Sequence, residues 1–400
     1  MRILFLTHRL PYAPNRGDRI RSYHLLRLLA RHHEVHVVSL VHDDEEHRHL
    51  GEVAALVASA RAAKVTKLRN HVAALLALPG DRPLTHVLLA SPAFNTAIHE
   101  SVAAAPPDVV LSFCTGVAPA VFTEPLSRVP CVLDMVDVDS EKWSDLAGRT
   151  GPPMKWIYRR EARTLRAFER RAMERALATA VVSERERMLA ERVLDHSALT
   201  VPVGVDVNAW SPPARIDRAP EIVFCAVFNY APNEEGAMWL ASEVWPSVRR
   251  QVPNARLKLV GMHPSARVRA LAVDGSIEVT GAVADVRPHV WRSAAAVAPL
   301  WLSRGTQTKV LEALAAGAPC IVTPAVLDGL PVAARNACLC REDARGFAEA
   351  IVACLLHPAS EARRTEIRQS VQDLDWDVQL APFLDILKGA AAAQSETLRG

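Results

Sequence analysis

The segment that decides the fold is SRGTQTKVLEALAAGAPCIVT, residues 303–323. Its apolar side chains recur at helical spacing, at Val310, Leu311, Leu314 and Ala315. Gly317 followed by Pro319 is a typical C-terminal stop, so the segment predicts a loop, a short helix and then an apolar strand. On that helix Glu312 falls beside the apolar stripe, on the same flank as Lys309.

A carboxylate in the middle of this helix has two explanations at this point. An exposed Lys309–Glu312 pair would contribute a few tenths of a kcal/mol to helix stability. Alternatively, Glu312 serves a ligand, and the rest of the chain has to decide between the two.

The bulk composition is that of a globular protein with a sizeable core. Of the 400 residues, 50% are hydrophobic and 23% are charged, and the length favours two domains or three. The net charge of +3 is too near zero to indicate nucleic-acid binding. Seven cysteines without a CxxC pair favour a reducing compartment and no structural zinc, and no apolar run is long enough to cross a membrane. We therefore expect a cytoplasmic protein.

Apolar strand-like runs alternate with helical patterns in both halves of the chain. The runs include residues 2–7, 34–41, 108–113 and 131–137, and later 221–228, 256–261, 295–300 and 320–323. This alternation is typical of βαβ units and predicts an α/β fold with a parallel sheet in each half. A proline-rich stretch around residues 201–220 has no sustained period and predicts a linker. The expected domains are residues 1–205, a linker over 206–220, a second domain over 221–370, and a C-terminal helix returning to the first domain, with a frayed tail, over 371–400.

Several motifs occur in the order found in one known family. They are FNYAPN, KLVG, VTGAVADVRPHVWRSAAAVAPL, KVLEALAAGAPCIVT and DGLPV, preceded by VSERER and VPVGVDVNAW. The chain thereby resembles the retaining glycosyltransferase family 4. It is most similar to the sugar transferases of PEP-CTERM/exosortase polysaccharide systems, which share the patterns RLPYAPNRGDRIRSYHLLRLLARHHEVHVV, DMVDVDSEKW and FNYAPNEEGAMWL.

The resemblance implies the GT-B fold, in which two Rossmann-like, doubly wound domains face each other across a cleft. The second domain would hold the nucleoside diphosphate sugar and the first the acceptor, with no cofactor and no metal ion. Glu312 matches the second of two family glutamates separated by seven residues, which binds the donor ribose. An ionised carboxylate can accept hydrogen bonds from two vicinal hydroxyls.

The chain departs from the family at the first of these glutamates, where it has Arg304. It also lacks the family's basic pair after the first strand of the second domain. We expect Arg304 and Lys309 to supply the positive charge for the diphosphate, aided by backbone N–H groups at the helix start. The donor-binding residues expected in full are Glu312, Gly305, Thr306, Gln307, Thr308, Asn229 and Tyr230.

Two segments of the first half are candidates for the acceptor side. The loop LPYAPNRGDR, residues 10–19, contains Arg16, Gly17 and Asp18; Gly17 permits close approach of a ligand, and Asp18 is a candidate N-cap. The alternative is an ordinary turn with a cap. Asp137 and Asp139 follow a strand and are candidate catalytic residues, because either can orient an acceptor or sugar hydroxyl. Arg304 and Lys309 are the other candidate catalytic residues. Alternatively, Asp139 or Ser140 caps the next helix.

Residues 155–192 contain 11 Lys/Arg and 6 Asp/Glu. Such a run is typical of a solvated helix face with i,i+4 pairs. Contact with anionic lipid at the inner face of the plasma membrane is the alternative.

The function expected is transfer of a hexose-type sugar, with retention, from a nucleoside diphosphate sugar to a polysaccharide or lipid-linked oligosaccharide in exopolysaccharide biosynthesis. Two rivals are open: a nucleotide-sugar epimerase on the same fold, and a non-catalytic relative acting as a scaffold.

Overall fold

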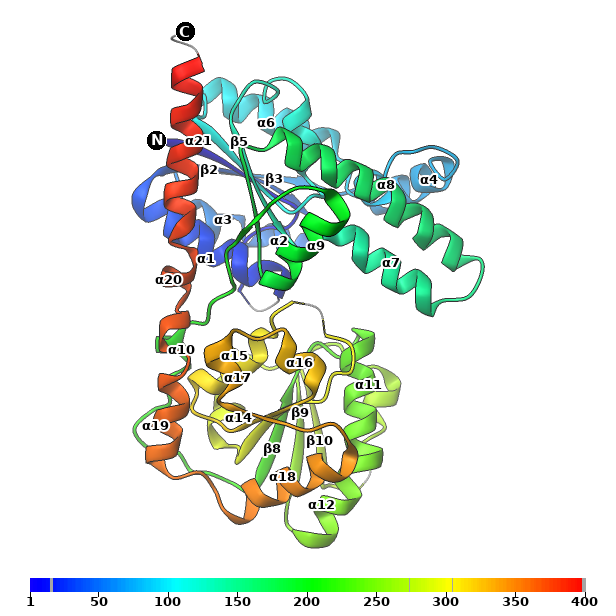
Figure 1. Cartoon of the computed structure of the whole chain (residues 1–400), viewed down its shortest axis with the longest axis vertical. Helices are drawn as coiled ribbons and strands as arrows, with labels where there is room; N and C mark the ends of the chain where they lie inside the picture. Colours follow the sequence, from blue (N-terminus) through cyan, green and yellow to red (C-terminus); the bar gives the residue numbers. More distant parts are fainter. Residues whose placement is uncertain (15–16, 273, 304, 398–400) are drawn as a thin grey trace. The chain divides into compact units, whose positions relative to one another are not determined.

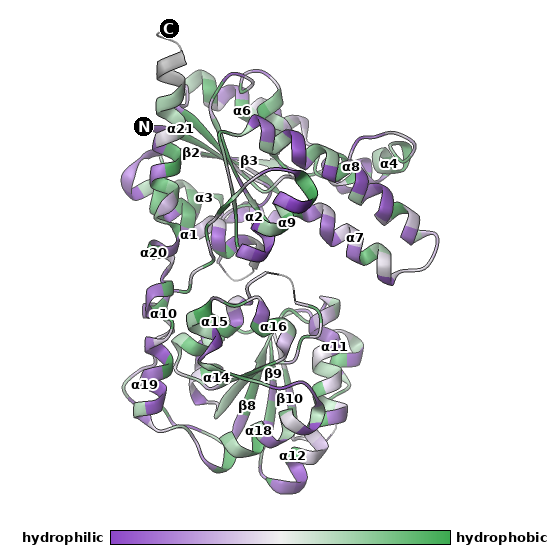
Figure 2. Ribbon diagram, viewed as in Figure 1, coloured by the Kyte–Doolittle hydropathy of each residue, from purple (hydrophilic) through white to green (hydrophobic). Residues whose placement is uncertain are grey.

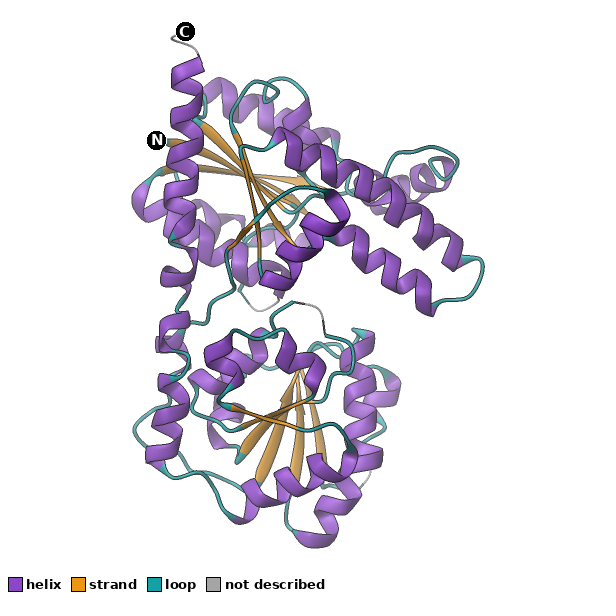
Figure 3. Ribbon diagram, in the orientation of Figure 1, coloured by secondary structure: helices purple, strands orange, loops and turns teal. Residues whose placement is uncertain are grey.

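The chain forms two α/β units, which we describe separately (Figure 1). A computed structural model describes residues 1–14, 17–272, 274–303 and 305–397. Unit 1 comprises Met1–Pro202 and Gln379–Gly400, and unit 2 comprises Val203–Val378. Each unit has one sheet with helices around it (Figure 3).

The sheet of unit 1 has seven strands, and every neighbouring pair is parallel. Across the sheet, the order is β3 (Ser59–Lys64), β2 (Glu34–Val41), β1 (Arg2–Thr7), β4 (Val109–Phe113), β5 (Cys131–Val136), β6 (Ala178–Val181) and β7 (Leu199–Thr200). The helices of this unit are α1 (Gly17–His32), α2 (Asp44–Arg48), α3 (Leu50–Ala54), α4 (Lys67–Leu76), α5 (Leu84–Leu88), α6 (Pro92–Ala104), η1 (Ala118–Phe122), α7 (Asp139–Arg149), α8 (Met154–Arg175), α9 (Glu184–Leu194) and α21 (Pro382–Thr397).

The sheet of unit 2 has six strands and is also parallel. The order is β10 (Ile277–Gly281), β9 (Arg256–Val260), β8 (Glu221–Cys225), β11 (Ala295–Ala298), β12 (Cys320–Val322) and β13 (Cys338–Cys340). Its helices are α10 (Val207–Trp210), α11 (Ala231–Trp239), η2 (Leu240–Val244), α12 (Trp245–Gln251), α13 (Ala266–Arg269), α14 (Arg287–Arg292), α15 (Thr308–Ala315), α16 (Pro324–Asp328), α17 (Val332–Arg335), α18 (Ala344–Leu356), α19 (Glu361–Gln369) and η3 (Gln372–Leu374). α20 (Trp376–Leu380) spans the division between the units.

The central strands fold this way because they are almost continuous apolar runs, as parallel strands covered on both faces must be, whereas the edge strand β3, SARAAK, is only half-buried. β4, for example, is buried at every position. Phe94 and Ile98 of α6 join one hydrophobic cluster of unit 1, and Met173 of α8 and Leu189 of α9 join another. Figure 2 shows these apolar strands enclosed by helices whose outer faces are polar. No helix in the described part of the chain is both long and apolar enough to span a bilayer.

The C-terminal helix α21 packs against β4 and β5 of unit 1. Arg21 lies at the centre of this packing, because its guanidinium binds both carboxylate oxygens of Asp134, at 2.8 and 3.2 Å, and the carbonyl of Pro202 at 2.9 Å. It also lies 5.6 Å from the ring centre of Phe383 in α21. Burial raises the pKa of Asp134, and Arg21 opposes that effect. Asp134 is therefore a structural group that joins the chain's end to its first domain.

The helix expected between residues 303 and 323 is confirmed as α15. Its four apolar side chains are buried. Gly317 takes a left-handed φ of 73°, its N–H donates to the carbonyl of Leu314, and the N–H of Ala318 donates to that of Ala313. These two bonds form a Schellman motif, which explains why the helix stops here.

Two of the irregular and charged segments contain features that the sequence pattern did not indicate. The linker over 206–220 contains a short helix, α10, in which the Asp206 carboxylate accepts the N–H of Ala209. In the basic run 155–192, the expected exposed face and its ion pairs are present, since Arg187 pairs with Glu184 and Glu191. Three other arginines of the run bind backbone carbonyls. Arg160 binds carbonyls of residues 77–82, Arg170 those of Val193 and Leu194, and Arg175 those of Leu126, Ser127 and Val129.

Candidate functional site

The strand order of unit 2 reverses between β8 and β11. β9 and β10 lie on one side of β8, whereas β11, β12 and β13 lie on the other. In open parallel sheets, ligands bind outside the carboxyl ends of the strands at such a reversal. β8 ends at Cys225 and β11 at Ala298, and the loop after β11 leads into α15. The start of α15 therefore belongs to the region where this fold class holds its ligands.

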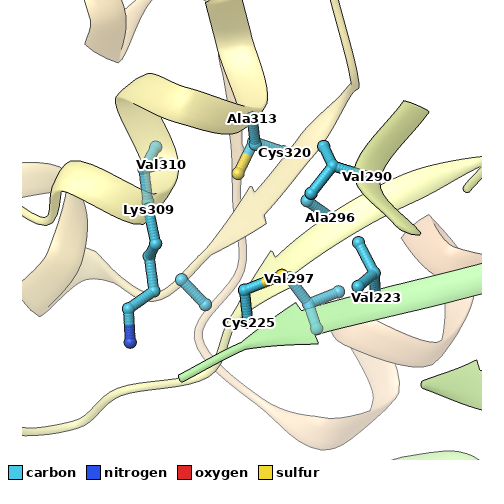
Figure 4. Close-up of a pocket in the computed structure, with 10 residues that line it drawn as sticks. Val223, Cys225, Val290, Ala296, Val297, Lys309, Val310, Ala313 and Cys320 are labelled. Carbon is cyan, nitrogen blue, oxygen red and sulfur yellow. The ribbon is translucent and has the colours of Figure 1, made fainter. Parts of the chain in front are cut away.

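Lys309 extends from the first turn of α15 toward the end of β8 (Figure 4). Its Nζ donates a hydrogen bond to Asn233 Oδ1 at 2.9 Å and lies 5.1 Å from the ring centre of Phe224. Burial lowers the pKa of Lys309 to about 8, while Cys225 and Glu312 favour the charged form. A cation with a perturbed pKa at the ends of parallel strands is suited to an anionic ligand.

Glu312 lies one helical turn after Lys309 and is partly buried. Burial raises the pKa of its carboxyl to about 7, and the nearby Lys309 opposes this effect. The explanation by an exposed Lys309–Glu312 pair is wrong, because Lys309 bonds to Asn233. Within residues 1–14, 17–272, 274–303 and 305–397 the Glu312 carboxylate has no hydrogen-bond partner. A desolvated carboxylate without a protein donor is expected where a ligand supplies the donors.

The loop before α15 is held by its own side chains and by two glycines. Thr306 Oγ1 donates to the carbonyl of Gly329 at 2.9 Å, and Gln307 Nε2 donates to Ser303 Oγ at 3.0 Å. Gly305 takes a φ of 65°, and a Cβ on Gly329 would lie 2.6 Å from the Gly305 carbonyl oxygen. No side chain caps α15; the N–H of Val310 donates to the carbonyl of Gln307 at 2.9 Å, and the N–H groups of Thr308 and Lys309 precede this first bond of the helix. Arg304 lies outside the described residues.

The loop after β8 supplies the third part of this region. Asn229 and Tyr230 are exposed there, and Asn233 is buried in the first turn of α11. Asn233 Nδ2 donates to the carbonyl of Val227 at 2.9 Å, which fixes the amide so that Oδ1 faces Lys309. The sequence reasoning did not assign Asn233, although it lies in the motif FNYAPN. Its place in that motif, at the start of the helix that follows β8, was the available signal.

A cavity beneath α15 is lined by Lys309, Cys225 and apolar side chains (Figure 4). Its volume of about 10 Å³ is at the lower limit for one water molecule. Sites for drug-sized ligands and cofactors usually exceed about 300 Å³. A ligand of Lys309 and Glu312 must therefore lie outside the strand ends and not in this cavity. Among the residues described, no three His, Cys, Asp or Glu side chains are placed to hold a metal ion.

In unit 1 the strand order reverses between β1 and β4, and the acceptor-side candidates follow these strands and β5. Arg16 lies outside the described residues. α1 begins at Gly17, so Asp18 lies within the first turn. The expectation that Asp18 is the N-cap is therefore wrong, because the helix begins one residue before it.

Asp137 and Asp139 are joined by one lysine. Lys142 Nζ lies 2.8 Å from Asp137 Oδ2 and 2.8 Å from Asp139 Oδ1, and Thr115 Oγ1 donates to Asp139 Oδ2 at 3.2 Å. Their side chains keep 18% and 29% of their exposure, so solvent still reaches both. The two carboxylates could accept a hydroxyl proton or orient a hydroxyl group, with Lys142 fixing their positions.

The alternative that Asp139 or Ser140 caps α7 is wrong. No side chain of the cap residue bonds to this helix, and Asp139 is its first residue. Glu169 of α8 accepts the N–H of Ser140 at 3.0 Å, and Glu186 of α9 accepts that of Val138 at 2.8 Å. Burial, followed by the charge of Asp139, raises the pKa of Glu169 to about 8. Buried carboxyl groups from neighbouring helices thus accept the N–H groups at the start of α7, and Asp139 binds Lys142 and Thr115 instead of capping the helix.

Part of the chain, including the site residues of α15, matches a known protein family. Residues 219–357, which include Lys309 and Glu312, match the family described as glycosyl transferases group 1. A search of curated protein sequences found no match.

Several solved structures resemble the whole chain. Sucrose-phosphate synthase from Thermosynechococcus elongatus is 17% identical, with a TM-score of 0.73 over 98% of this chain and 100% of that one. HepE of Anabaena, solved with UDP, is 11% identical, with a TM-score of 0.67 over 97% and 100%. WaaG, a glycosyltransferase involved in lipopolysaccharide biosynthesis, is 14% identical, with a TM-score of 0.62 over 97% and 100%.

These likenesses confirm the expected fold class, an α/β GT-B fold with two Rossmann-like domains. The family match confirms that unit 2 carries a glycosyltransferase domain. With that domain and that fold, the protein is a glycosyltransferase.

Proposed function

We propose that the protein is a retaining transferase of the family 4 type that uses a nucleoside diphosphate sugar. The observation that carries the proposal is the pair of groups on α15: a lysine with a lowered pKa, and a partly buried carboxylate that accepts no hydrogen bond from the residues that the structure describes. A nucleoside diphosphate offers the complement to both, since its phosphates are anionic and its ribose has two vicinal hydroxyls.

In the proposed complex, Glu312 accepts hydrogen bonds from the ribose hydroxyls. Lys309 and the first N–H groups of α15 bind the diphosphate, with Gly305, Thr306, Gln307 and Thr308 shaping that end of the helix. Asn229 and Tyr230 are exposed beside this region and are proposed donor contacts. The contact of Arg304 with the diphosphate stays a prediction.

The chemistry proposed is front-face displacement, in which the leaving phosphate accepts the proton of the acceptor hydroxyl. Stabilising the diphosphate as the glycosidic bond breaks is then the main contribution of Lys309 and of the α15 amides. Asp137 and Asp139 would orient the acceptor hydroxyl, which reduces the entropy lost in reaching the reactive geometry. No covalent enzyme intermediate and no metal ion enters this scheme.

We propose a polysaccharide or lipid-linked oligosaccharide as the acceptor, in exopolysaccharide biosynthesis of the PEP-CTERM/exosortase type. The motifs RLPYAPNRGDR and DMVDVDSEKW support this assignment by resemblance. The WaaG likeness is compatible with it, because that protein takes part in lipopolysaccharide biosynthesis. Work on such acceptors would place the protein in the cytoplasm, at the inner face of the plasma membrane.

The proposal is tested by incubating the protein with a panel of uridine, guanosine and thymidine diphosphate sugars, without and with membrane lipid extracts. We expect release of the nucleoside diphosphate from one donor, accelerated by the acceptor. Conversion of a donor to its 2-epimer would indicate the rival epimerase. Binding of nucleotide without any turnover would indicate the scaffold.

A further inference from the structure

Helix α7 of unit 1 begins at Asp139, directly after β5, and packs along α8 (Figure 1). Two contacts hold the start of this helix pair. Glu169 of α8 accepts the N–H of Ser140 at 3.0 Å, and Arg166 of α8 forms an ion pair with Glu141. The start of α7 is therefore fixed in place, as a surface that orients a ligand has to be.

One face of α7 carries an aromatic ring beside the acidic pair. Asp139 and Trp143 are four residues apart and share a helical face, and Lys142 lies on the same side. The ring centre of Trp143 lies 5.3 Å from that of Tyr158 in α8, at an interplanar angle of 41°. Both rings are half-buried, and Leu146, one turn further along this face, keeps 41% of its exposure. A partly exposed aromatic surface thus begins one helical turn from Asp139.

The charged groups beside this aromatic surface suit a neutral sugar hydroxyl. Lys142 Nζ bonds to Asp137 and Asp139 and has a third N–H, and its side chain keeps 39% of its exposure. A hydroxyl group can donate to one of the carboxylates and accept a hydrogen bond from this N–H. Two carboxylates and one ammonium sum to a charge of −1, which disfavours a phosphate at this position.

The spacing along α7 matches a chain of sugars. One face of a pyranose ring consists largely of C–H groups and packs on an aromatic ring, while the hydroxyls reach polar neighbours. Four residues advance a helix by about 6 Å, close to the length of one pyranose unit in a glycan. A glycan whose reactive hydroxyl lies at Asp139 therefore places its next sugar over Trp143.

We propose that Trp143 and Tyr158 form a second sugar subsite, which binds the penultimate ring of a neutral glycan acceptor. The inference rests on the proposed function and deepens it, because it assigns an acceptor at least two sugar rings long. The protein then extends an existing glycan and does not attach the first sugar to a carrier. An earlier glycosyl transfer must supply its acceptor.

The first test is fluorine NMR of the full chain labelled with fluorotryptophan. The chain has eight tryptophans, and the resonance of Trp143 is the one absent from Trp143→Phe. We expect this resonance to shift on titration with at least one of cellobiose, lactose, maltose and mannobiose, and to shift less with the corresponding methyl monosaccharides. The resonance of Trp156, which is exposed on α8 two residues before Tyr158 and so on the other side of that helix, should not move.

The second test measures nucleoside diphosphate release from the active donor, with membrane lipid extract as the acceptor. Trp143→Ala should raise the extract concentration needed for half-maximal release by about 3- to 12-fold, because the stacking surface is lost. It should leave the nucleotide Kd and the slow donor hydrolysis without extract unchanged. Trp143→Phe should restore most of the acceptor affinity at the wild-type melting temperature, and Trp156→Ala is the matched control and should behave as the wild type does.

The proposal would be overturned if no disaccharide shifted the Trp143 resonance, or if Trp143→Ala and the wild type depended equally on the extract. A concentration-dependent dimer that Trp143→Ala abolishes would also overturn it, in favour of a second copy of the chain. Absence of release from every donor would instead contradict the proposed function. The NMR titration needs no donor, so it decides on the subsite in that case as well.

Discussion

Replacing Glu312 by Gln should weaken donor binding and at the same time stabilise the unliganded protein. The substitution keeps the shape of the side chain and removes its charge. Loss of a charged hydrogen bond to the ribose should cost about 1.5–3 kcal/mol of binding free energy, or roughly 10- to 150-fold in Kd.

The stabilisation follows from the pKa of this carboxyl, which rises from its usual 4.5 to about 7. At about 1.4 kcal/mol per pH unit, ionising Glu312 costs the folded protein at most about 3.5 kcal/mol. Partial exposure to solvent and the lost attraction to Lys309 reduce the expected gain of Glu312→Gln to about 1–2 kcal/mol. The folded pKa lies above the unfolded one, so the cost grows as pH rises from about 4.5 to about 7 and is absent below that window.

The assay is calorimetric titration with UDP and GDP, together with thermal unfolding at about pH 8 and about pH 5. The variant should melt about 2–6 °C higher than the wild type at the higher pH, with little difference at the lower pH. Glu349→Gln is the control, because Glu349 is an exposed helical carboxylate of unit 2, paired with Arg345 at 2.8 Å. Unchanged nucleotide affinity in Glu312→Gln would refute the assignment of Glu312 to the ribose. If the variant and the wild type differed in melting temperature by the same amount at both pH values, the electrostatic reasoning would be refuted.

Three further predictions concern the same regions. A plot of nucleotide affinity against pH should be bell-shaped with a maximum near about 7.5, because Glu312 ionises through about 7 and Lys309 loses its proton through about 8. The variant Lys309→Met should lose the decrease in affinity at alkaline pH, and a pH-independent affinity in the wild type would contradict the prediction. Gly317→Ala should destabilise unit 2 by about 1–3 kcal/mol in urea unfolding, since the φ of Gly317 is 73° and a Cβ would lie 2.9 Å from the Arg364 carbonyl oxygen. If the variant unfolded at the same urea concentration as the wild type, the predicted backbone strain would be disproved. Asp139→Asn should lower kcat/KM for the acceptor by about 10- to 100-fold while leaving the donor Kd unchanged. Equal transfer rates in the variant and the wild type would indicate that Asp139 has only a structural role.

The parts of this fold that depend on local pattern could be predicted from sequence. The helix α15 follows from its apolar spacing and from the Gly317 stop, and the central parallel strands follow from their continuous apolar runs. The edge strand β3, SARAAK, has no such run and was not predicted. The candidate donor residues could be predicted as far as Glu312 and Lys309, because both lie on one flank of that helix.

The rest depends on contacts that periodicity does not encode. Lys309 meets Asn233, 76 residues earlier, only because β8 and β11 are neighbours across the reversal of strand order. Arg21 and Asp134 are 113 residues apart and meet through a sheet and a returning terminus. The N-terminus of α7 looked like a site for its own Asp or Ser cap, but carboxylates from α8 and α9 satisfy it. The basic run likewise gave no sign that its arginines hold loops through their carbonyls.

The most direct test of the central claim is a crystal structure of the protein with the nucleoside diphosphate that it releases in the donor assay. We predict the two ribose hydroxyls within hydrogen-bond distance of the Glu312 carboxylate, about 2.5–3.2 Å, and the phosphates at Lys309 and the first N–H groups of α15. A nucleotide whose ribose contacts a different carboxylate, or whose phosphates lie away from α15, would contradict the account.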